Sequence, residues 1–295
     1  MTDRGRTAQG PGRAAGGRAP RAKVWFVGAG PGAADLVTLR GARAIAAADV
    51  VVWASSLVHE DLLGHARPAA LVVDSASLPL ERVREIFARA AAEGLVVARV
   101  HTGDPSLWGA VQEQREICDE LGLAHETVPG VSAFSAVAAA VDRELTAPEI
   151  SQSVVLTRLE GGRTPVPPSQ TVRGLAAHGT TMALYLSVAR AGRLQEELLA
   201  GGYPPQTPCV VARAVTWPEE LLLRCELSRL EATCREHGLT KHTLVLVGPA
   251  LASRGARSLL YHPGFAHGCR PADPAVPRPQ APGPDPDPDD GTGAP

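Results

Sequence analysis

The stretch VWFVGAGPGA, residues 24–33, decides the expected fold of this chain. Its first four residues, Val24–Val27, predict a short buried strand, and the glycines after them predict a tight turn. A helical pattern over about 36–48 comes next, and Val50–Trp53 predicts a second buried strand. A strand, a glycine-rich turn, a helix and another apolar strand are together typical of a parallel α/β sheet.

The same alternation continues through the first half of the chain. Leu71–Val73 and Leu95–Val100 predict further strands, and Pro79–Glu93 and 106–121 predict helices. Because the strands are continuously apolar, we expect a largely parallel sheet that helices cover on both faces.

The second half predicts a different sheet. Its expected strands are Thr181–Ser187, Pro208–Ala214, Leu221–Glu226 and Thr243–Val247, with helices at 190–200 and 228–237. Only the short turn Trp217-Pro218-Glu219 separates two of these strands, which favours antiparallel pairing. The expected fold class is therefore α/β with two domains, a mostly parallel N-terminal sheet and a mixed C-terminal sheet.

We expect four segments along the chain: a disordered tail at 1–23, an N-terminal α/β domain at 24–145, a C-terminal α/β domain at 146–262, and a disordered tail at 263–295. The first tail is rich in Gly, Ala and Arg, and residues 271–295 contain nine Pro and five Asp. Neither composition buries enough apolar surface to offset the entropy of ordering the chain.

Composition excludes several classes of protein. The 295 residues are 44% hydrophobic, and no apolar run approaches the ~18 residues that a membrane span needs. The formal net charge of −2 gives no electrostatic case for nucleic-acid binding. Arg outnumbers Lys 27 to 2, so Arg is almost the only side-chain cation available to an anionic ligand.

The five cysteines are spread widely, without a CxxC pair or a Cys/His cluster of metal-ligand spacing. This pattern predicts reduced thiols in a cytoplasmic protein and no metal site. Residues 1–23 have no apolar segment of the kind that a secretory signal requires.

The GAGPGA turn at 28–33 fits the dinucleotide pattern G-x-G-x-x-G/A, so an NAD- or FAD-dependent oxidoreductase has to be considered. Two features oppose it. Pro31 removes an N–H where a pyrophosphate needs donors, and the second strand runs into Ala54-Ser55-Ser56 with no acid to hold a ribose. A tight turn without a ligand is the structural alternative.

Two more glycine turns follow predicted strands. In HTGDPSLWG, 101–109, Asp104 predicts the N-cap of the helix 106–121, while Gly103 would let a flat ligand lie against the backbone. In VPGVSAF, 128–134, Ser132 could serve as the cap of a helix at 133–141. Three such turns at strand ends indicate one crevice, at the edge where open α/β sheets bind ligands.

A polar segment, LTRLEGGRTPVP at 156–167, carries Arg158 and Arg163, and its prolines predict a long loop. Most such arginines are solvated at the surface. The alternative is an anion site, because a guanidinium binds carboxylates through two parallel hydrogen bonds.

Taken together, VGAGPGAADLVTLRG, HTGDPSLWGA, VPGVSAF, ELTAPEISQSVVLTR, GRTPVP and ARAVTWPEE resemble the tetrapyrrole methylase superfamily of S-adenosylmethionine-dependent enzymes. The resemblance covers about 24–250. Within the superfamily, 144–167 and TWPEE are similar to the enzymes that methylate precorrin-4, or its cobalt form, at C-11 in cobalamin biosynthesis.

The resemblance implies a homodimer of two-domain chains, with S-adenosylmethionine in the cleft between the domains and an anionic tetrapyrrole as substrate. The family's cofactor contacts carry over to Pro31, Thr102, Gly103, Asp104, Leu107, Ser132, Ala133, Leu186, Arg213 and Ala214. Arg158 and Arg163 become candidates for the substrate's carboxylates, with Arg213 as a further candidate. Ala54-Ser55 departs from the aromatic-Gly or Ala-Gly pair expected before Ser56.

The resemblance leaves the catalytic residues open, because C-11 of a precorrin is already electron-rich and methyl transfer needs mainly proximity and alignment. Other methylases of the superfamily remain alternatives: those of uroporphyrinogen-III, of other precorrin carbons, of diphthine and of ribosomal RNA. A non-catalytic binding protein is a further alternative, which the intact turns disfavour.

Overall fold

The computed structural model describes residues 22–161, 165–252 and 258–277. Contacts within it divide the chain into two compact units, one of Met1–Ala136 with Ala214–Glu220 and one of Val137–Arg213 with Leu221–Pro295. The short piece Ala214–Glu220 is thus separated in sequence from the rest of the first unit.

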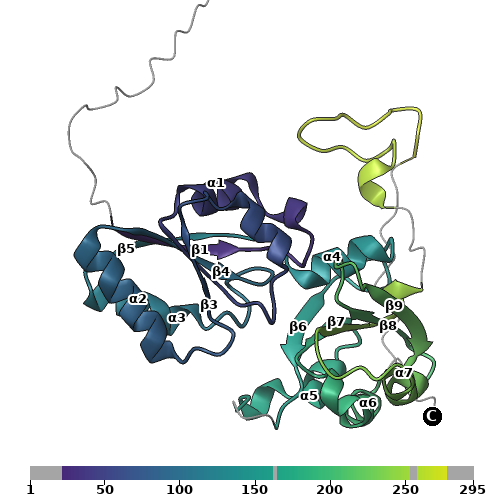
Figure 1. The fold of residues 1–295 in the computed structure, drawn as a ribbon. Helices are drawn as coiled ribbons and strands as arrows, with labels where there is room; N and C mark the ends of the chain where they lie inside the picture. The colour runs from purple at the N-terminus through teal and green to yellow at the C-terminus, as the bar shows by residue number, and fades with distance from the viewer. Residues whose placement is uncertain (1–21, 162–164, 253–257, 278–295) are drawn as a thin grey trace, which may run out of the picture. The chain divides into compact units, whose positions relative to one another are not determined.

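The first unit contains a five-stranded sheet of order β3-β2-β4-β1-β5 (Figure 1). Its strands are β1 (Lys23–Gly28), β2 (Val50–Trp53), β3 (Leu71–Asp74), β4 (Val96–His101) and β5 (Ala124–Val128). Every neighbouring pair is parallel, which confirms the predicted parallel sheet.

Helices cover both faces of this sheet because its inner strands β1 and β2 are apolar on both sides. Val24 and Phe26 pack with α2 (Leu80–Glu93) and α3 (Val111–Glu120), whereas Val27 packs on the other face with α1 (Leu39–Ala47). Figure 1 shows α1 on the side of the sheet opposite α2 and α3. The alternation of side chains along β1 therefore supplies two cores.

The second unit contains a mixed sheet of order β6-β7-β10-β8-β9. The strands are β6 (Val154–Arg158), β7 (Thr181–Tyr185), β8 (Pro208–Arg213), β9 (Leu221–Glu226) and β10 (Thr243–Val247). Among the described strands, β6 and β7 pair in parallel and the other three pairs are antiparallel. The antiparallel β8–β9 pair confirms the prediction from the short turn that joins these two strands.

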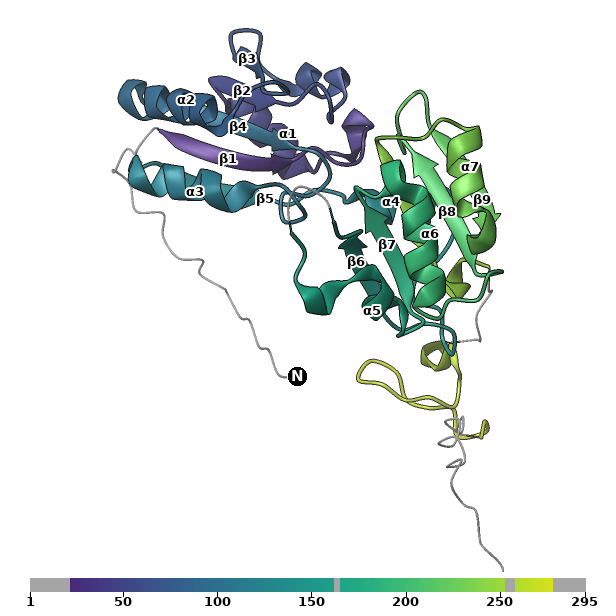
Figure 2. The same cartoon turned by 90° about the horizontal axis from the view of Figure 1, so that it is seen from below.

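One hydrophobic core joins this sheet to α5 (Val172–Ala176), α6 (Ala191–Ala200) and α7 (Leu230–Glu236). Figure 2 shows α6 and α7 lying along the strands. The remaining helix, α4 (Ala133–Ala140), follows β5. No helix among the described residues is both long and apolar enough to cross a membrane.

The predicted helix over 106–121 is wrong at its start. Residues 105–108 form turns, Ala110 has a left-handed backbone, and α3 begins only at Val111. Asp104 therefore does not cap this helix. Its carboxylate instead accepts the N–H of Ser106, two residues on, which closes a local turn that competes with a helix.

Candidate functional site

The three glycine turns predicted from the sequence lie side by side. They follow β4, β1 and β5, which are neighbours in the sheet in that order. Gly30 and Gly103 form an antiparallel bridge in which Gly103 N donates to Gly30 O at 2.7 Å and Gly30 N donates to Gly103 O at 3.2 Å. Because all strands of the sheet are parallel, their carboxyl ends place the turns at one edge.

The glycines in these turns are required by the approach of one backbone to another. A Cβ atom on Gly28 would lie 2.5 Å from the Cα of Gly130, and one on Gly130 would lie 2.1 Å from the carbonyl oxygen of Gly103. No side chain fits at either contact. The turns therefore form a tightly packed backbone cluster, to which we refer as the glycine cluster.

Asp104 ties two of the turns together. One carboxylate oxygen accepts the N–H of Gly130 at 2.8 Å, and the other accepts the N–H of Ser106 at 2.8 Å and the Ser106 hydroxyl. Burial by itself would raise the pKa of Asp104, but these hydrogen bonds outweigh it and hold the pKa below the ordinary value. Asp104 thus stays ionised and keeps the HTGDP turn on the VPG turn.

Gly103 has a left-handed backbone, with φ of +60°. A Cβ atom there would meet only ordinary contacts, the nearest at 3.8 Å from Ser132 Cα and Ala133 N. Glycine is therefore needed at 103 for its backbone conformation, and a side chain would project toward residues 131–133. Thr102 beside it is exposed, and Leu107 is half-buried.

The segment Ala214–Glu220, in which the sequence predicts a short turn and one cofactor contact, also contacts the first glycine turn. Thr216 Oγ1 accepts the N–H of Ala33 at 3.0 Å, and Trp217 Nε1 donates to the carbonyl of Pro31 at 3.0 Å. Glu220 holds this segment in turn by accepting the N–H of Thr216 at 2.6 Å. We refer to 214–220 as the clamp segment.

The clamp segment also explains why residue 32 is glycine. A Cβ atom on Gly32 would lie 2.1 Å from the Trp217 ring. Spacing along the sequence could not reveal this contact, since Pro31 and Trp217 are 186 residues apart. The available signal was the co-occurrence of GAGPG and TWPEE in one chain.

A buried basic pair lies at the end of β4, just before the HTGDP turn. Arg99 donates to Gln114 and to Ser75, both at 2.9 Å, and burial lowers the pKa of Arg99 to about 10. Burial and the charge of Arg99 lower the pKa of His101 to about 3, so its imidazole is neutral at physiological pH. Among the described residues, nothing hydrogen-bonds the buried His101 Nε2.

Strained backbone gathers next to the predicted cofactor contacts. The described residues contain eight non-glycine residues with positive φ, and five of them flank the motifs: Trp108, Ala110, Leu186, Ala214 and Thr216. Leu186 is also 72% exposed, which is unusual for a leucine. Such strain persists only where the surrounding structure enforces it, and it concentrates at ligand sites.

The predicted cofactor contacts divide between the two units. Pro31, Thr102, Gly103, Asp104, Leu107, Ser132, Ala133 and Ala214 belong to the first unit, and Leu186 and Arg213 belong to the second. The structure brings the turns that carry Pro31, Gly103 and Asp104 together in the glycine cluster and at its clamp segment. Leu186 follows β7, and Arg213 ends β8.

Arg158 ends β6, and its Nη2 donates to the carbonyl of Pro165 at 3.1 Å, across the loop that follows the strand. Arg163 lies outside the described residues. The structure thus gives Arg158 a part in shaping its loop, which the sequence analysis did not foresee.

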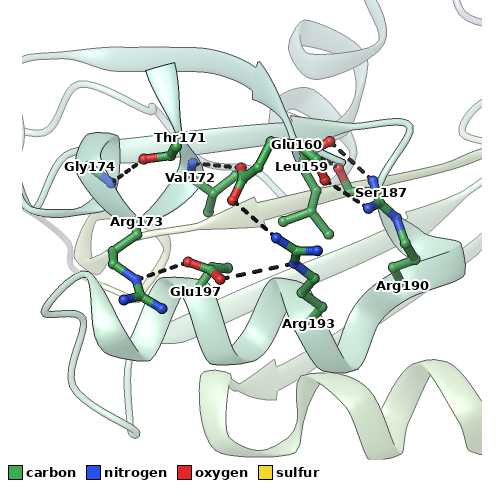
Figure 3. A network of polar contacts seen from close by, with 10 residues as sticks. All are labelled: Leu159, Glu160, Thr171, Val172, Arg173, Gly174, Ser187, Arg190, Arg193 and Glu197. Atoms are coloured by element: carbon green, nitrogen blue, oxygen red, sulfur yellow. Dashed lines mark hydrogen bonds and ion pairs between the residues drawn. The ribbon is translucent and has the colours of Figure 1, made fainter. Parts of the chain in front are cut away.

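Hydrogen bonds and an ion pair hold Glu160, at the start of this loop, to the first residue of α5 and to the start of α6 (Figure 3). Arg190 donates to the carbonyl of Glu160 at 2.7 Å, and the Glu160 carboxylate accepts the N–H of Val172 at 3.0 Å. Arg193 forms ion pairs with Glu160, at 3.9 Å between Nη2 and Oε1, and with Glu197, at 4.0 Å between Nε and Oε1. The loop after β6 is therefore held at its start.

The described residues contain no group of three or more His, Cys, Asp or Glu side chains that could hold a metal ion. The site is instead rich in backbone groups and in strained turns.

Comparison with known proteins gives a consistent result. Residues 23–231 match the family of tetrapyrrole (corrin/porphyrin) methylases. The chain is 41% identical over 245 residues to precorrin-4 C(11)-methyltransferase of Mycobacterium tuberculosis strain CDC 1551, which covers 83% of this chain and 98% of that protein. It is 40% identical over 252 residues to cobalt-precorrin-4 C(11)-methyltransferase of Priestia megaterium, with coverage of 84% and 97%.

Among solved structures, the X-ray structure of a cobalt-precorrin-4 methyltransferase matches with a TM-score of 0.78 at 39% identity, over 81% of this chain and 100% of that one. This likeness confirms the predicted fold class, a methylase architecture with one parallel and one mixed sheet. The family match, the near-complete coverage of the relatives and the fold agree: the chain belongs to the tetrapyrrole methylase family.

Proposed function

We propose that this protein transfers a methyl group from S-adenosylmethionine to C-11 of precorrin-4, giving precorrin-5 in cobalamin biosynthesis. The observation that carries the proposal is identity of 40–41%, over almost the whole length of relatives named for C-11 methylation. Cobalt-precorrin-4 is the alternative substrate, because relatives named for either substrate are equally similar to this chain.

The first glycine turn supports a methyl donor over a dinucleotide. Its amides are already engaged: Ala29 N donates to His101 O, Gly30 N to Gly103 O, and Ala33 N to Thr216 Oγ1. Pro31 has no N–H, so few donors remain for a pyrophosphate. The turn nevertheless fits the pattern of a dinucleotide fingerprint, which shows how little that pattern specifies alone.

The residues present suit a ligand held largely through backbone groups. The candidate contacts are Pro31, Thr102, Gly103, Asp104, Leu107, Ser132, Ala133, Leu186, Arg213 and Ala214. Exposed Thr102 and the strained, exposed Leu186 leave surface that a bound ligand would cover. Bound S-adenosylmethionine would supply an electrophilic methyl group on a sulfonium.

The chain's own contribution to the reaction is alignment. Holding two reactants in attack geometry can supply about 7–11 kcal/mol of a barrier. The glycine cluster, joined by Asp104 and by the clamp segment, gives a rigid surface for this purpose. His101 stays neutral at physiological pH, because burial and the charge of Arg99 lower its pKa to about 3.

Precorrins carry many carboxylates, and we assign Arg158 and Arg163 to them. A guanidinium has five N–H donors, so the hydrogen bond of Arg158 to Pro165 O is compatible with binding a carboxylate. The anchored loop would then present Arg158 in a fixed position.

The proposal includes domains at 24–145 and 146–262 with the cofactor in the cleft between them, a homodimer and a cytoplasmic location. The tails expected at 1–23 and 263–295 lie mostly outside the described residues, although Lys23 begins β1 and residues 263–277 are described. Unpaired cysteines suit a reducing compartment. Limited proteolysis tests the domains and the tails, and sedimentation equilibrium tests the dimer.

Calorimetry tests the class of cofactor. We expect micromolar binding of S-adenosylmethionine and of its demethylated product, with no measurable heat for NAD. Tight NAD binding without adenosylmethionine binding would place the protein among dinucleotide-dependent oxidoreductases instead.

A further inference from the structure

Three of the five cysteines lie in the core of the second unit. Cys209 is on β8, Cys225 on β9 and Cys234 on α7. Cys209 and Cys234 are 1% and 2% exposed, whereas Cys225 is half-buried and packs against the same core. None of them has a place in the proposed methyl transfer.

Cys209 and Cys225 stand directly opposite each other in the antiparallel pair of β8 and β9. Opposed residues in such a pair have Cα atoms about 4.5–5.5 Å apart and side chains on the same face. Disulfide-bonded cysteines have Cα atoms about 4.4–6.8 Å apart, so the backbone already meets the main requirement for a bond. Cys234 comes from a helix and does not share this register.

The position of β9 allows the small adjustment that a bond would need. β9 is an edge strand, paired only with β8. Its partner β8 lies between β10 and β9 and is held on both sides. Bringing the two sulfur atoms together therefore requires movement of one edge strand.

The two thiols are also electrostatically distinct. A hydrogen bond from Cys209, a hydrogen bond with Thr233 and the charge of Arg229 together lower the pKa of Cys225 to about 7, against the effect of burial. The interaction with Cys225 raises the pKa of Cys209, and burial adds to the increase. Cys225 is thus the more exposed thiol and the one more readily ionised.

We propose that Cys209 and Cys225 form a thiol pair that small oxidised disulfides convert to a cross-strand disulfide. The Cys225 thiolate attacks one sulfur of the small disulfide, forms a mixed disulfide and releases one thiolate. Cys209 then loses its proton, and its thiolate attacks Cys225 Sγ and displaces the second small thiolate, which takes up a proton. The small disulfide is reduced to two thiols, and the protein dithiol is oxidised.

The experiment uses the full chain with Cys269→Ser, because Cys269 is exposed and would react first. The protein is treated with glutathione disulfide, digested with trypsin without reduction and analysed by mass spectrometry. Cleavage at Arg213, Arg224, Arg229 and Arg235 places the three cysteines on separate peptides: 194–213, 225–229 and 230–235.

We expect 194–213 joined to 225–229, with the loss of two hydrogen atoms, and separation of the two peptides by dithiothreitol. Cys209→Ala should trap glutathione on Cys225, and Cys225→Ala should leave Cys209 unmodified. Cys234→Ala is the matched control, a buried cysteine of the same core whose loss should leave the joined peptides unchanged.

Three results would overturn the proposal. They are a bond between 225–229 and 230–235, a stable glutathione adduct on Cys225 while Cys209 is present, and unmodified thiols in a protein with native circular dichroism. The mapping on the Cys269→Ser protein alone separates these outcomes, so it decides the matter even if Cys209→Ala does not fold. It uses no methyltransferase assay and is independent of the proposed function.

Discussion

Single glycines set the geometry of the candidate site. Gly28 and Gly130 are fixed by contacts that leave no room for a Cβ atom, whereas Gly103 is fixed by its left-handed backbone and faces residues 131–133 across ordinary contact distances. A small side chain at 103 therefore tests the site without breaking the packing of the cluster.

Gly103→Ala should destabilise the fold by about 1–2 kcal/mol, the penalty of a left-handed backbone for a non-glycine residue. It should also weaken adenosylmethionine binding, because the methyl group projects toward 131–133. Gly94→Ala is the matched control: φ is +69° and a Cβ atom there meets nothing within 4 Å. Calorimetry should show weaker binding for Gly103→Ala only, and equal affinity in both variants would make Gly103 purely structural.

Asp104 is the second residue whose role is specific enough to test. Its pKa lies below the ordinary 3.8, so its carboxylate contributes stability that is present above that value and is lost as the pH falls through the lowered pKa. Asp104→Asn retains a single acceptor oxygen. It should cost about 1–2 kcal/mol at pH 7, which allows for partial exposure of the hydrogen bonds to a charged group.

Urea unfolding of Asp104→Asn and of the unmodified protein, from neutral pH down to pH 3, measures the stability that the Asp104 charge contributes. The gap between the two unfolding free energies should narrow as the pH falls below 3.8. A gap that is constant across the range would mean that the charge of Asp104 contributes nothing.

At the scale of elements, the clamp segment matters because it supports the first glycine turn from a distant part of the chain. The clamp segment contains two residues with a left-handed backbone, Ala214 and Thr216. The next residue, Trp217, donates its Nε1–H to the carbonyl oxygen of Pro31. The hydrogen bond from Trp217 Nε1 to Pro31 O should contribute about 0.5–1.5 kcal/mol to the free energy of unfolding.

Trp217→Phe keeps an aromatic ring and removes the N–H, so we expect adenosylmethionine affinity to fall roughly two- to tenfold and the free energy of unfolding to fall by about 0.5–1.5 kcal/mol. Trp25→Phe is the control, since Trp25 lies on β1 and its ring faces the Lys23 ammonium group, 3.6 Å from the ring centroid. Isothermal titration of both variants provides the comparison. An unchanged affinity in Trp217→Phe would separate the clamp segment from cofactor binding.

The loop after β6 gives a prediction about the substrate. Arg158→Ala should weaken precorrin binding more than tenfold at saturating cofactor, because a hydrogen bond to a charged group contributes about 1.5–3 kcal/mol. Arg173→Ala is the control, since it removes an exposed arginine of the same unit that pairs with Glu197. Steady-state kinetics should show a raised KM for the precorrin in Arg158→Ala and an unchanged KM in Arg173→Ala. If Arg158→Ala has the same KM as the unmodified protein, Arg158 does not bind the substrate and only holds the loop after β6.

The elements also show what could be read from the sequence. Strands β1 to β4 and the β8–β9 pair were predicted closely, because apolar runs and turn spacing are local signals. Strand β5, with the sequence AHETV, was expected only as the strand before the VPG turn. The start of α3 was predicted wrongly, because the Asp104 carboxylate accepts the N–H groups of Ser106 and Gly130 and does not cap the helix. β6 and α5 were missed beside the proline-rich stretch. The contacts of the clamp segment with the first glycine turn were not predicted, since they join residues 183 and 186 positions apart.

For the whole molecule, the chain's path between its two units is the main structural consequence of the sequence. It leaves the first unit after Ala136, returns for Ala214–Glu220, and then completes the second unit. Arg213 and Ala214, adjacent in sequence and both predicted to contact the cofactor, thus belong to different units. The family resemblance, and not local periodicity, supplied the function.

The most direct test of the central claim is the position of the transferred methyl group. S-adenosylmethionine labelled with carbon-13 in its methyl group is incubated with the protein and with precorrin-4 or cobalt-precorrin-4, and the product is examined by NMR. The account predicts a single labelled methyl group at C-11 with at least one of the two substrates. Label at another carbon, or no transfer to either substrate by protein that binds adenosylmethionine, would contradict it.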